Sequence, residues 1–407
     1  MYIYKVGVVG AGTMGAQIAE VVSYAGVPVL LADIQESLAR RGVESVRAIY
    51  QARVDKGKMT PEQLEEKMLL VTASPNLEAL HDVDLVIEAV SEEVTLKQRV
   101  FRELDRVCAR SAILASNTSA LSISAIGAST TRPGKVLGLH FFNPAYAMPL
   151  VEVIPGLATD PQTVDDVVGF AESLRKTPVI VKECAGFLVN RLLSPYLNEA
   201  VWCFQDGDVS IKEIDQDMVA FGMPVGPFML LDTVGLDIAF EVARILHRSY
   251  GPRMAPAPLL EALVKAGRWG IKSGRGFYEY SGAEERSGDQ ALDTLLQQVR
   301  QGGGQTRMEW TRLRPLLAMV NEAVTAYQEG VASARDIDLA MVAGTGFPNE
   351  KGGPLHVADQ LGIDHVLHEL EALRDTLGVR FWPAPMLRRM VDAGFTGQLA
   401  GRGFFAY

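Results

Sequence analysis

The sequence predicts an α/β domain with a doubly wound sheet, followed by two tandem all-α domains. Three observations predict this organisation. A glycine-rich turn at residues 10–15 follows the first apolar run, apolar runs then alternate with helical patterns as far as residue 182, and short motifs recur beyond that point. We therefore expect domains at residues 1–182, 183–285 and 307–407, the last two being copies of one helical unit.

The composition indicates a globular protein large enough for two or three domains. The chain has 407 residues and a formal net charge of −10. This charge argues against general nucleic-acid binding and against attraction to an anionic membrane surface. No apolar run approaches the roughly 18 residues of a membrane span, and the N-terminus has no signal-peptide pattern. Cys108, Cys184 and Cys203 have neither metal-binding nor redox spacing, so we expect no metal and a cytoplasmic protein.

The first apolar run, residues 5–10, leads directly into the turn GAGTMG and then into a helix at residues 16–24. In this context of strand, turn and helix, GxGxxG binds a dinucleotide. The first glycine permits the tight turn, the second lets a pyrophosphate approach the backbone, and the third lets helix and strand pack closely. The helix N-terminus offers N–H groups to the phosphates. The motif predicts a Rossmann-type domain, with candidate cofactor residues Gly10, Gly12, Thr13, Met14 and Gly15.

A second strand at residues 28–33 ends in Asp33. An acid about 20 residues after the glycines is placed to accept a hydrogen bond from the 2′-hydroxyl of an adenosine ribose. Its charge repels a 2′-phosphate, so the sequence favours NAD over NADP. A purely structural glycine turn is the minor alternative.

A helical hairpin is expected after the second strand. Apolar residues recur at helical spacing between residues 39 and 50, and TPEQ at residues 60–63 predicts the capped start of a second helix. Arg53, Lys56 and Lys58 lie on the first helix and the turn that follows it. We consider Arg53 and Lys56 as contacts for the phosphates of a large ligand, against the alternative of a solvated helical face.

Apolar runs at residues 83–90 and 112–116 predict two buried parallel strands, with an amphipathic helix at residues 96–107 between them. Ligands bind at the carboxyl ends of such strands. Glu88 and Glu92 lie at the end of the first run, and the cluster SNTS at residues 116–119 follows the second. This cluster is either a plain turn or a polar shelf over a substrate. A helix at residues 161–174 and a strand at 178–181 complete the domain.

The stretch VLGLHFFNPAYAMPLVEVIP at residues 136–155 predicts two strands separated by an Asn-Pro turn. His140 lies in the first strand and Glu152 in the second. A carboxylate that holds one imidazole nitrogen fixes the tautomer and leaves the other nitrogen free to move a proton. The alternative is a hydrogen-bonded core histidine near an unrelated edge glutamate.

The second half is mainly helical and repeats itself. Asn198-Glu-Ala recurs at Asn321, an offset of 123, and GRGF at residue 274 recurs at residue 401, an offset of 127. Each copy has an apolar face that it cannot cover alone, so we expect the copies to form an internal pseudo-dimer, and self-association into a homodimer stays open. Asn190 opens the first copy, whereas the matching position is Leu313, so we expect a structural second copy. Residues 281–306 are expected to be linker at both ends, with a short helix at 289–300.

These motifs together resemble the 3-hydroxyacyl-CoA dehydrogenase family. The resemblance runs from residue 5 to residue 280 with few gaps, and the repeat extends it to the C-terminus. It rests on GAGTMG at 10–15, SNTS at 116–119, HFFNP at 140–144, LVE at 150–152 and GFLVNR at 186–191. It implies an NAD domain followed by a helical domain with the site between them. The implied reaction oxidises the 3-hydroxyl of an acyl-CoA to the 3-keto thioester, with NAD⁺ taking the hydride.

Carried over by position, the resemblance makes His140 the general base that accepts the hydroxyl proton and Glu152 the group that orients it. The other residues that it implies are Ser119 and Asn190 at the substrate oxygen, Asn143 at the substrate, Asp33 at the adenosine ribose, and Glu92 and Lys97 near the cofactor. The implied partner is an acyl-CoA thioester.

Two other functions are compatible with parts of the sequence. A dehydrogenase of free 3-hydroxyacids also opens with a GxGxxG strand, but it uses a lysine three residues before an asparagine, where this chain has Phe187. A non-catalytic NAD-binding scaffold would have no need for His140, Glu152, Ser119 and Asn190 together. We expect no enoyl-CoA hydratase module and hence a single step, in fatty-acid or related acyl-CoA metabolism.

Overall fold

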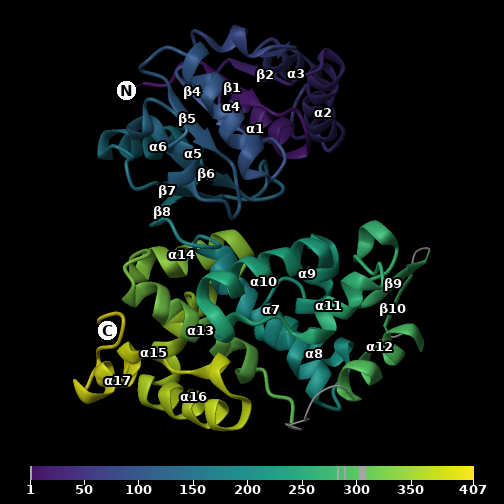
Figure 1. Ribbon diagram of the computed structural model, residues 1–407, viewed down its shortest axis with the longest axis vertical. Helices are drawn as coiled ribbons and strands as arrows, with labels where there is room; N and C mark the ends of the chain where they lie inside the picture. The colour runs from purple at the N-terminus through teal and green to yellow at the C-terminus, as the bar shows by residue number, and fades with distance from the viewer. Residues whose placement is uncertain (1, 282–283, 288–289, 302–308) are drawn as a thin grey trace. The chain divides into compact units, whose positions relative to one another are not determined.

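The chain divides into two compact units, Met1–Phe187 and Leu188–Tyr407. The computed structural model describes residues 2–281, 284–287, 290–301 and 309–407. The first unit is an eight-stranded sheet with helices on both faces, and the second is mainly helical (Figure 1). This α/β then all-α organisation confirms the predicted fold class. The finer division at 1–182, 183–285 and 307–407 stays a prediction.

The sheet of the first unit has the strand order β3-β2-β1-β4-β5-β6-β7-β8. Neighbouring strands are parallel, except that β6 and β7 are antiparallel. The connections turn in opposite directions from the β1–β4 pair, and in such sheets ligands bind beside the carboxyl ends of the strands at this switch point. The strands are β1 (Val6–Val9), β2 (Val29–Ala32), β3 (Val71–Ser74), β4 (Leu85–Glu88), β5 (Ile113–Ser116), β6 (Val136–Phe141), β7 (Leu150–Pro155) and β8 (Thr177–Ile180).

The helices form two layers that bury the apolar sheet faces. Side chains of α1, α2 and α6 pack in one cluster with β1 and β2, whereas those of α4 and α5 pack in a second cluster on the other face. The helices are α1 (Thr13–Tyr24), α2 (Glu36–Asp55), α3 (Pro61–Met68), α4 (Val94–Val107), α5 (Ile123–Gly127) and α6 (Pro161–Ser173). Two 3₁₀ turns complete the unit, Leu77–Leu80 and Pro133–Lys135.

Two short elements were not predicted from the sequence. Strand β3 pairs with β2 at the edge of the sheet, where its middle residues, Thr72 and Ala73, are not fully buried. Because an edge strand needs few apolar side chains, this run has no strong apolar pattern in the sequence. Helix α5 has only five residues. By contrast, the cap predicted for α3 is confirmed, because the Thr60 side chain accepts a hydrogen bond from the Gln63 amide and Gln63 Oε1 accepts one from the Thr60 amide.

Helix α1 buries a carboxylate in the core of the first unit. The Glu20 side chain is fully buried, and Arg53 Nη2 lies 2.7 Å from Glu20 Oε1. The Arg53 guanidinium also lies over the Tyr24 ring, 4.3 Å from its centroid. Burial raises the pKa of Glu20 to about 7, against the opposing charge of Arg53.

We expect the Glu20→Gln variant to gain stability relative to the parent as the pH rises from about 4.5 to 7. The folded chain holds the Glu20 proton more tightly than the unfolded chain, so ionisation of this carboxyl destabilises the fold progressively across that interval. At about 1.4 kcal/mol per pKa unit, the full change is about 3 kcal/mol. Guanidinium denaturation at pH 5 and pH 8, followed by far-UV circular dichroism, measures it. An equal stability difference at both pH values would contradict this assignment.

The second unit contains two series of helices that repeat one arrangement. The first is α7 (Val189–Asp206), α8 (Ile211–Phe221), α9 (Pro227–Val234), α10 (Leu236–Tyr250) and α11 (Pro258–Lys265). The second is α13 (Leu313–Gln328), α14 (Ala334–Thr345), α15 (Pro354–Leu361), α16 (Ile363–Leu377) and α17 (Pro385–Asp392). The connecting elements are β9 (Tyr278–Ser281), β10 (Glu284–Ser287), α12 (Gln290–Gln301) and the 3₁₀ turns Gly251–Met254, Ile271–Ser273, Asn349–Lys351, Val379–Phe381 and Gln398–Ala400. We call residues 188–280 the first copy and 312–407 the second copy.

The repeated asparagine makes the same contacts in both copies. Asn198 donates to the Ala255 carbonyl at 2.9 Å and accepts from the Ala257 amide at 2.8 Å. Asn321 donates to the Trp382 carbonyl at 2.9 Å and accepts from the Ala384 amide at 2.8 Å. The sequence repeat is therefore also a repeat of structure.

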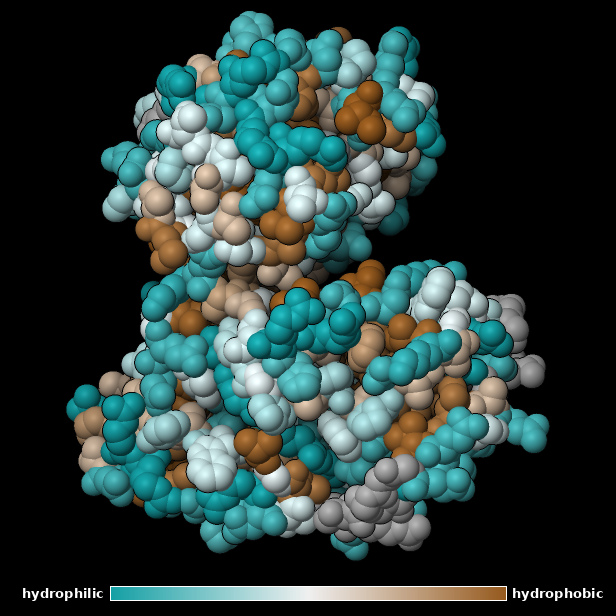
Figure 2. Space-filling view, in the orientation of Figure 1, coloured by the Kyte–Doolittle hydropathy of each residue, from teal (hydrophilic) through white to brown (hydrophobic). Residues whose placement is uncertain are grey.

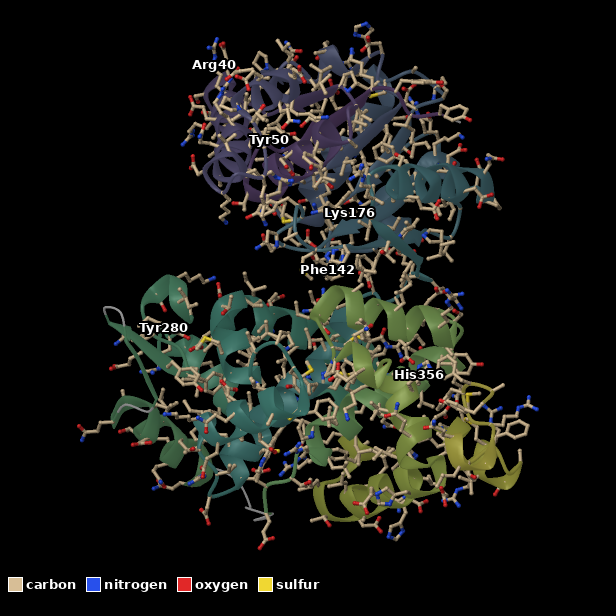
Figure 3. All side chains as sticks on the ribbon, turned by 180° about the vertical axis from the view of Figure 1, so that it is seen from behind. Arg40, Tyr50, Phe142, Lys176, Tyr280 and His356 are labelled. Carbon is tan, nitrogen blue, oxygen red and sulfur yellow. The ribbon has the colours of Figure 1, made fainter. Side chains whose placement is uncertain are left out.

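The repeated aspartate has the same kind of backbone partners in both copies but a different side-chain partner in each. Asp215 accepts hydrogen bonds from the first amides of α9 and from the Tyr278 hydroxyl at 2.8 Å. Asp338 accepts from the first amides of α15, and its third contact is His356 Nδ1 at 2.6 Å. The His356 ring, labelled in Figure 3, stacks on Phe405, which stands where the first copy has Tyr278. A histidine thus replaces the missing hydroxyl, and burial raises the pKa of both aspartates to about 6.

Helices α7 and α13 pack against each other with crosswise ion pairs. Arg191 Nε on α7 lies 2.7 Å from Glu322 Oε1 on α13, and Arg314 Nε on α13 lies 2.5 Å from Glu199 Oε1 on α7. A second arginine joins each carboxylate, Arg253 at Glu322 and Arg380 at Glu199. Corresponding residues of the two copies therefore exchange partners, as they do across a two-fold axis.

The connecting segment was predicted only in part. Residues 284–287 form strand β10, antiparallel to β9, where linker was expected. Helix α12 is close to the helix predicted at 289–300. The predicted linker residues 302–306 lie outside the described residues. Helix α12 packs on α11 and α7, and its Leu292 and Leu296 are buried in the core of the first copy.

None of the helices in the described part of the chain is long and apolar enough to cross a membrane. The visible face of each unit carries apolar residues scattered among polar ones (Figure 2).

Candidate active site

The antiparallel pair β6 and β7 brings His140 and Glu152 directly opposite each other. Side chains of directly opposed residues lie on the same face of a sheet. The His140 Nδ1 atom lies 2.7 Å from Glu152 Oε2, and the two residues are 5% and 0% exposed. A buried carboxylate accepts hydrogen bonds, so the proton is assigned to Nδ1 and a lone pair to Nε2.

Ser119 faces the other nitrogen of the same imidazole. Its Oγ lies 3.0 Å from His140 Nε2, at the end of the loop that follows β5. The structure thus brings Ser119, His140 and Glu152 into one hydrogen-bonded chain. Neither a plain turn at residues 116–119 nor an isolated core histidine describes this arrangement.

A network of charged residues holds the loop that carries Ser119. Glu92 Oε1 accepts from Thr118 Oγ1 at 2.5 Å and from the Ser119 amide at 2.9 Å. Lys97 Nζ lies 3.4 Å from Glu92 Oε2 and donates to Glu88 Oε1 at 2.7 Å. Since Lys97 is only 1% exposed, its visible role is to fix these carboxylates, and contact of Glu92 and Lys97 with a cofactor stays a prediction.

Two phenylalanines for which the sequence predicted no role in this site lie against the His140 imidazole. The ring centroids of Phe142 and Phe187 lie 4.5 and 5.9 Å from that of His140. Phe187 has a φ of 49°, directly after Gly186 with a φ of 74°. A bulky residue in the left-handed region is strained, and such strain concentrates at functional sites. Their signal in the sequence was their place inside the motifs HFFNP and GFLVNR.

The three glycines of the turn each serve a different physical need. Gly10 has a φ of 98°, and a Cβ at Gly15 would lie 1.7 Å from the Gly10 carbonyl oxygen, so neither tolerates a side chain. A Cβ at Gly12 would meet nothing within 4 Å, so space is left for a ligand above the backbone. Gly12 precedes the first turn of α1, which contains Thr13 and Met14. This turn has no acidic residue, and no side chain caps it. These features fit a pyrophosphate at the helix N-terminus.

Asp33 is held beside this turn by two backbone amides. Its Oδ2 accepts from the Ala11 amide and its Oδ1 from the Ile34 amide, each at 2.8 Å. The carboxylate is half-buried at the end of β2. Its position next to the glycines fits the predicted contact with a ribose hydroxyl.

The remaining predicted substrate residues lie in varied surroundings. Asn143 Oδ1 accepts a hydrogen bond from Gln17 Nε2 at 3.1 Å, and Gln17 Oε1 accepts from the Ala145 amide at 2.7 Å. Arg53 is engaged by Glu20 and Tyr24, whereas Lys56, just after α2, is exposed. Asn190 lies in the first turn of α7, in the second unit, and is half-buried.

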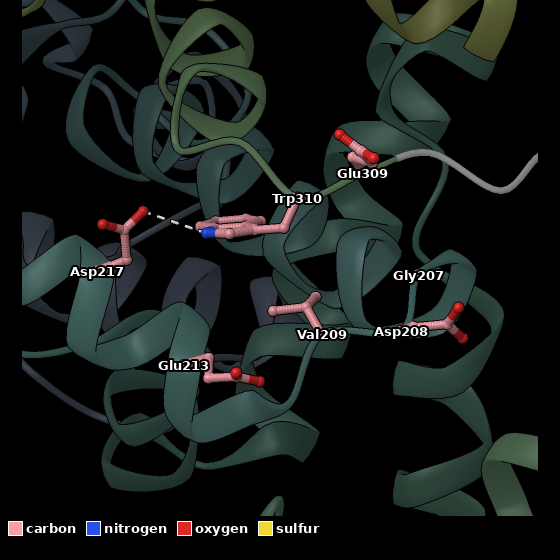
Figure 4. Close-up of a pocket in the computed structure, with 7 residues that line it drawn as sticks. All are labelled: Gly207, Asp208, Val209, Glu213, Asp217, Glu309 and Trp310. Atoms are coloured by element: carbon pink, nitrogen blue, oxygen red, sulfur yellow. Dashed lines mark hydrogen bonds between the residues drawn. The ribbon is translucent and has the colours of Figure 1, made fainter.

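The second unit also contains an open pocket of about 670 Å³ near the end of α7 (Figure 4). Four carboxylates line it, and the Trp310 indole donates to one of them, Asp217 Oδ2, at 3.1 Å. None of the predicted site residues lines this pocket. Its negative charge would repel the phosphates of NAD or of coenzyme A. The four carboxylates are Asp208, Glu213, Asp217 and Glu309.

Comparison with known proteins identifies similar chains. Two family profiles match, the NAD-binding domain of 3-hydroxyacyl-CoA dehydrogenase at residues 5–184 and its C-terminal domain at residues 186–280 and again at 312–407. A 3-hydroxybutyryl-CoA dehydrogenase from Escherichia coli is 31% identical, with a TM-score of 0.87, over 97% of this chain and 100% of that one. The (S)-3-hydroxybutyryl-CoA dehydrogenase of Ralstonia eutropha is 38% identical, with a TM-score of 0.67, over 69% of this chain and 99% of that one.

Longer relatives match as well. The fatty acid oxidation complex subunit alpha of Shewanella sp. (strain MR-4) is 37% identical over 95% of this chain. The chain spans only 55% of the length of that relative. Taken with the match of both family domains over most of its residues, these similarities show that the chain belongs to the 3-hydroxyacyl-CoA dehydrogenase family and contains the family's NAD-binding domain.

Proposed function

We propose that the chain catalyses the reversible, NAD-dependent oxidation of (S)-3-hydroxyacyl-CoA to 3-oxoacyl-CoA. The observation that carries this proposal is the chain of contacts Ser119–His140–Glu152, with distances of 3.0 and 2.7 Å. The activities in the names of the relatives, 3-hydroxybutyryl-CoA dehydrogenase and fatty acid oxidation, support the same reaction class.

In this mechanism His140 is the general base. Its Nε2 accepts the proton of the 3-hydroxyl while Nδ1–H stays on Glu152, which stabilises the imidazolium. The substrate oxygen lies within hydrogen-bond reach of both Nε2 and the Ser119 hydroxyl, and Asn190 contributes a further contact to that oxygen. Phe142 and Phe187 keep water away from the ring.

The residues of the glycine turn and Asp33 fit NAD. Residues 10–15 hold the pyrophosphate and Asp33 holds the adenosine ribose. When bound, NAD⁺ supplies the acceptor for the hydride of C3. The other proposed contacts are those of Glu92 and Lys97 with the cofactor, and of Asn143, Lys56 and Arg53 with the acyl-CoA. For Arg53 this requires release from Glu20 or a phosphate that joins the pair.

We further propose that the two helical copies act as an internal pseudo-dimer. The crosswise pairs of Arg191 with Glu322 and of Arg314 with Glu199 support it. The proposed division at 183–285 and 307–407 rests on the motifs repeated at offsets of 123 and 127, and the structural role of the second copy rests on Leu313 at the position of Asn190. We propose a cytoplasmic location, in line with the absence of a membrane-spanning helix among the described residues.

The proposed reaction is tested by NADH absorbance on addition of acetoacetyl-CoA. We expect rapid NADH oxidation and at least tenfold slower oxidation of NADPH, because Asp33 repels the 2′-phosphate. Free acetoacetate is the matched control for the coenzyme A group. Turnover of the free acid alone would favour the free-hydroxyacid dehydrogenase, and silence with short and long acyl-CoAs alike would favour the NAD-binding scaffold.

A further inference from the structure

The second copy carries an open groove at its C-terminal end. It has a volume of about 460 Å³ and lies between the end of α13, helix α17 and the C-terminal turn. Its lining residues are Tyr327, Met386, Met390, Phe395 and residues 402–406. Tyr327 and Phe404 meet edge to face at its base, with ring centroids 5.6 Å apart.

The equivalent face of the first copy is buried. The repeat offsets match Tyr327, Met386, Met390 and Phe404 with Phe204, Leu259, Leu263 and Phe277. These four residues of the first copy are at most 8% exposed, whereas Tyr327, Met386 and Phe404 are all half-exposed. The matched residues of both copies are apolar. The difference in exposure therefore comes from the element that covers this face.

Helix α12 is the element that covers this face in the first copy. Its buried Leu292 and Leu296 pack in one cluster with Phe204, Leu259 and Leu263. Leu295 and Val299 pack on the edge of the same cluster. The occupant is therefore an amphipathic helix whose apolar residues recur at intervals of three and four, the spacing used when a helix fills a groove.

The second copy differs from the first in ways that indicate the charge of an occupant. Arg402, the counterpart of Arg275, lines the groove and stacks 4.0 Å from the centroid of the Phe395 ring, where the first copy has Arg268. Exposed Arg389 lies on α17 between the two methionines, where the first copy has Ala262. On α12, Arg300 donates to the Phe204, Gln205 and Gly207 carbonyls at the end of α7.

The corresponding carbonyls at the end of α13 are those of Tyr327, Gln328 and Gly330. Among them, the Tyr327 carbonyl, which matches that of Phe204, accepts from the Gly330 amide at 3.0 Å. An occupant with an arginine at the position of Arg300 would therefore find fewer free carbonyl acceptors here. The arginines at the rim of the groove favour carboxylates on the occupant instead. Methionine side chains at Met386 and Met390, in place of leucines, adapt to different apolar partners.

We propose that this groove binds an amphipathic helix of a partner polypeptide, with acidic residues beside its apolar face, in the way that α12 covers the first copy. The partner helix places leucine-type side chains against Tyr327, Met386 and Met390 and carboxylates near Arg402 and Arg389. This inference does not depend on the proposed reaction, because it concerns only the second copy.

The test uses the full chain and a fluorescein-labelled peptide with the sequence of α12, carrying Gln297→Glu, Gln298→Glu and Arg300→Glu. All three positions lie outside the buried leucine stripe of α12. Fluorescence anisotropy is expected to show saturable binding. The unmodified α12 peptide is expected to bind more weakly, and a peptide that also carries Leu292→Ser and Leu296→Ser not at all.

Variants of the groove decide where the peptide binds. Met386→Glu is expected to weaken binding at least tenfold, and Met390→Ala, which adds no charge, provides a second measurement. Leu399→Asp is the matched control, because Leu399 is exposed and does not line the groove. Absence of saturable binding, or equal binding by Met386→Glu, overturns the proposal. Concentration-dependent dimerisation that Met386→Glu abolishes would also overturn it, because the occupant would then be a second copy of this chain.

Discussion

The His140→Ala variant is expected to lose about 10² to 10⁴ in kcat while its NAD affinity stays within a factor of two. The substitution removes the imidazole that contacts both the Ser119 hydroxyl and Glu152. The glycine turn and Asp33, which fit the cofactor, are held by other contacts, those of the Asp33 carboxylate with the Ala11 and Ile34 amides. Steady-state oxidation of NADH by acetoacetyl-CoA measures kcat, and calorimetric titration with NADH measures the affinity.

The chain offers a matched control in its second unit. His356 also holds a buried carboxylate through Nδ1, at 2.6 Å from Asp338, so His356→Ala removes the same kind of pair. We expect this variant to keep the parent's kcat. Near-normal turnover in His140→Ala would show that another group is the base, and equal losses in both variants would indicate damage to the fold.

The parts of the site that a sequence reveals are those set by local geometry. The glycine turn could be predicted because the needs of Gly10 and Gly15 arise within six residues of chain. The pairing of His140 with Glu152 could be predicted because a short connection between two strands leaves few registers. Their observed register places them directly opposite each other.

The parts that the sequence did not reveal depend on contacts between distant segments. Lys97 was expected near a cofactor, and the structure shows it buried between Glu88 and Glu92. Phe187 was noted only because it stands where a free-hydroxyacid dehydrogenase has a lysine. Its left-handed backbone next to the imidazole leaves no periodic pattern in the sequence. Strand β3 was missed because an edge strand with one exposed face carries too few apolar residues to form a pattern.

One missed feature did have a signal in the sequence. Arg191 and Arg314 are separated by the same offset of 123 as the repeated asparagines, and so are Glu199 and Glu322. An arginine and a glutamate present in both copies, with no opposite charge three or four residues away in the sequence, indicate an exchange across a two-fold axis. Reading them in this way would have predicted the packing of α7 on α13 in residue detail.

Glu322→Gln and Glu199→Gln are expected to destabilise the second unit by similar amounts, about 3 kcal/mol each. Removing one member of a buried ion pair costs about 3–5 kcal/mol. We expect the lower end of this range, because Arg191 keeps Glu329 at 2.8 Å and Arg314 keeps Asp206 at 3.2 Å. Glu322 faces Arg191 and Arg253, and Glu199 faces the equivalent arginines of the other copy. Both carboxylates are at most 5% exposed at the side chain, so solvent screens neither pair.

The four tryptophans of the chain, Trp202, Trp269, Trp310 and Trp382, all lie in the second unit. Guanidinium denaturation followed by tryptophan fluorescence therefore measures the stability of that unit alone. Glu241→Gln is the matched control, because its ion pair with Arg244 is exposed and is expected to contribute less than about 1 kcal/mol. Since corresponding pairs across a two-fold axis have the same surroundings, a large loss in one variant and none in the other would be incompatible with a pseudo-dimer. Equal small losses would instead mean that apolar packing between α7 and α13 carries the association.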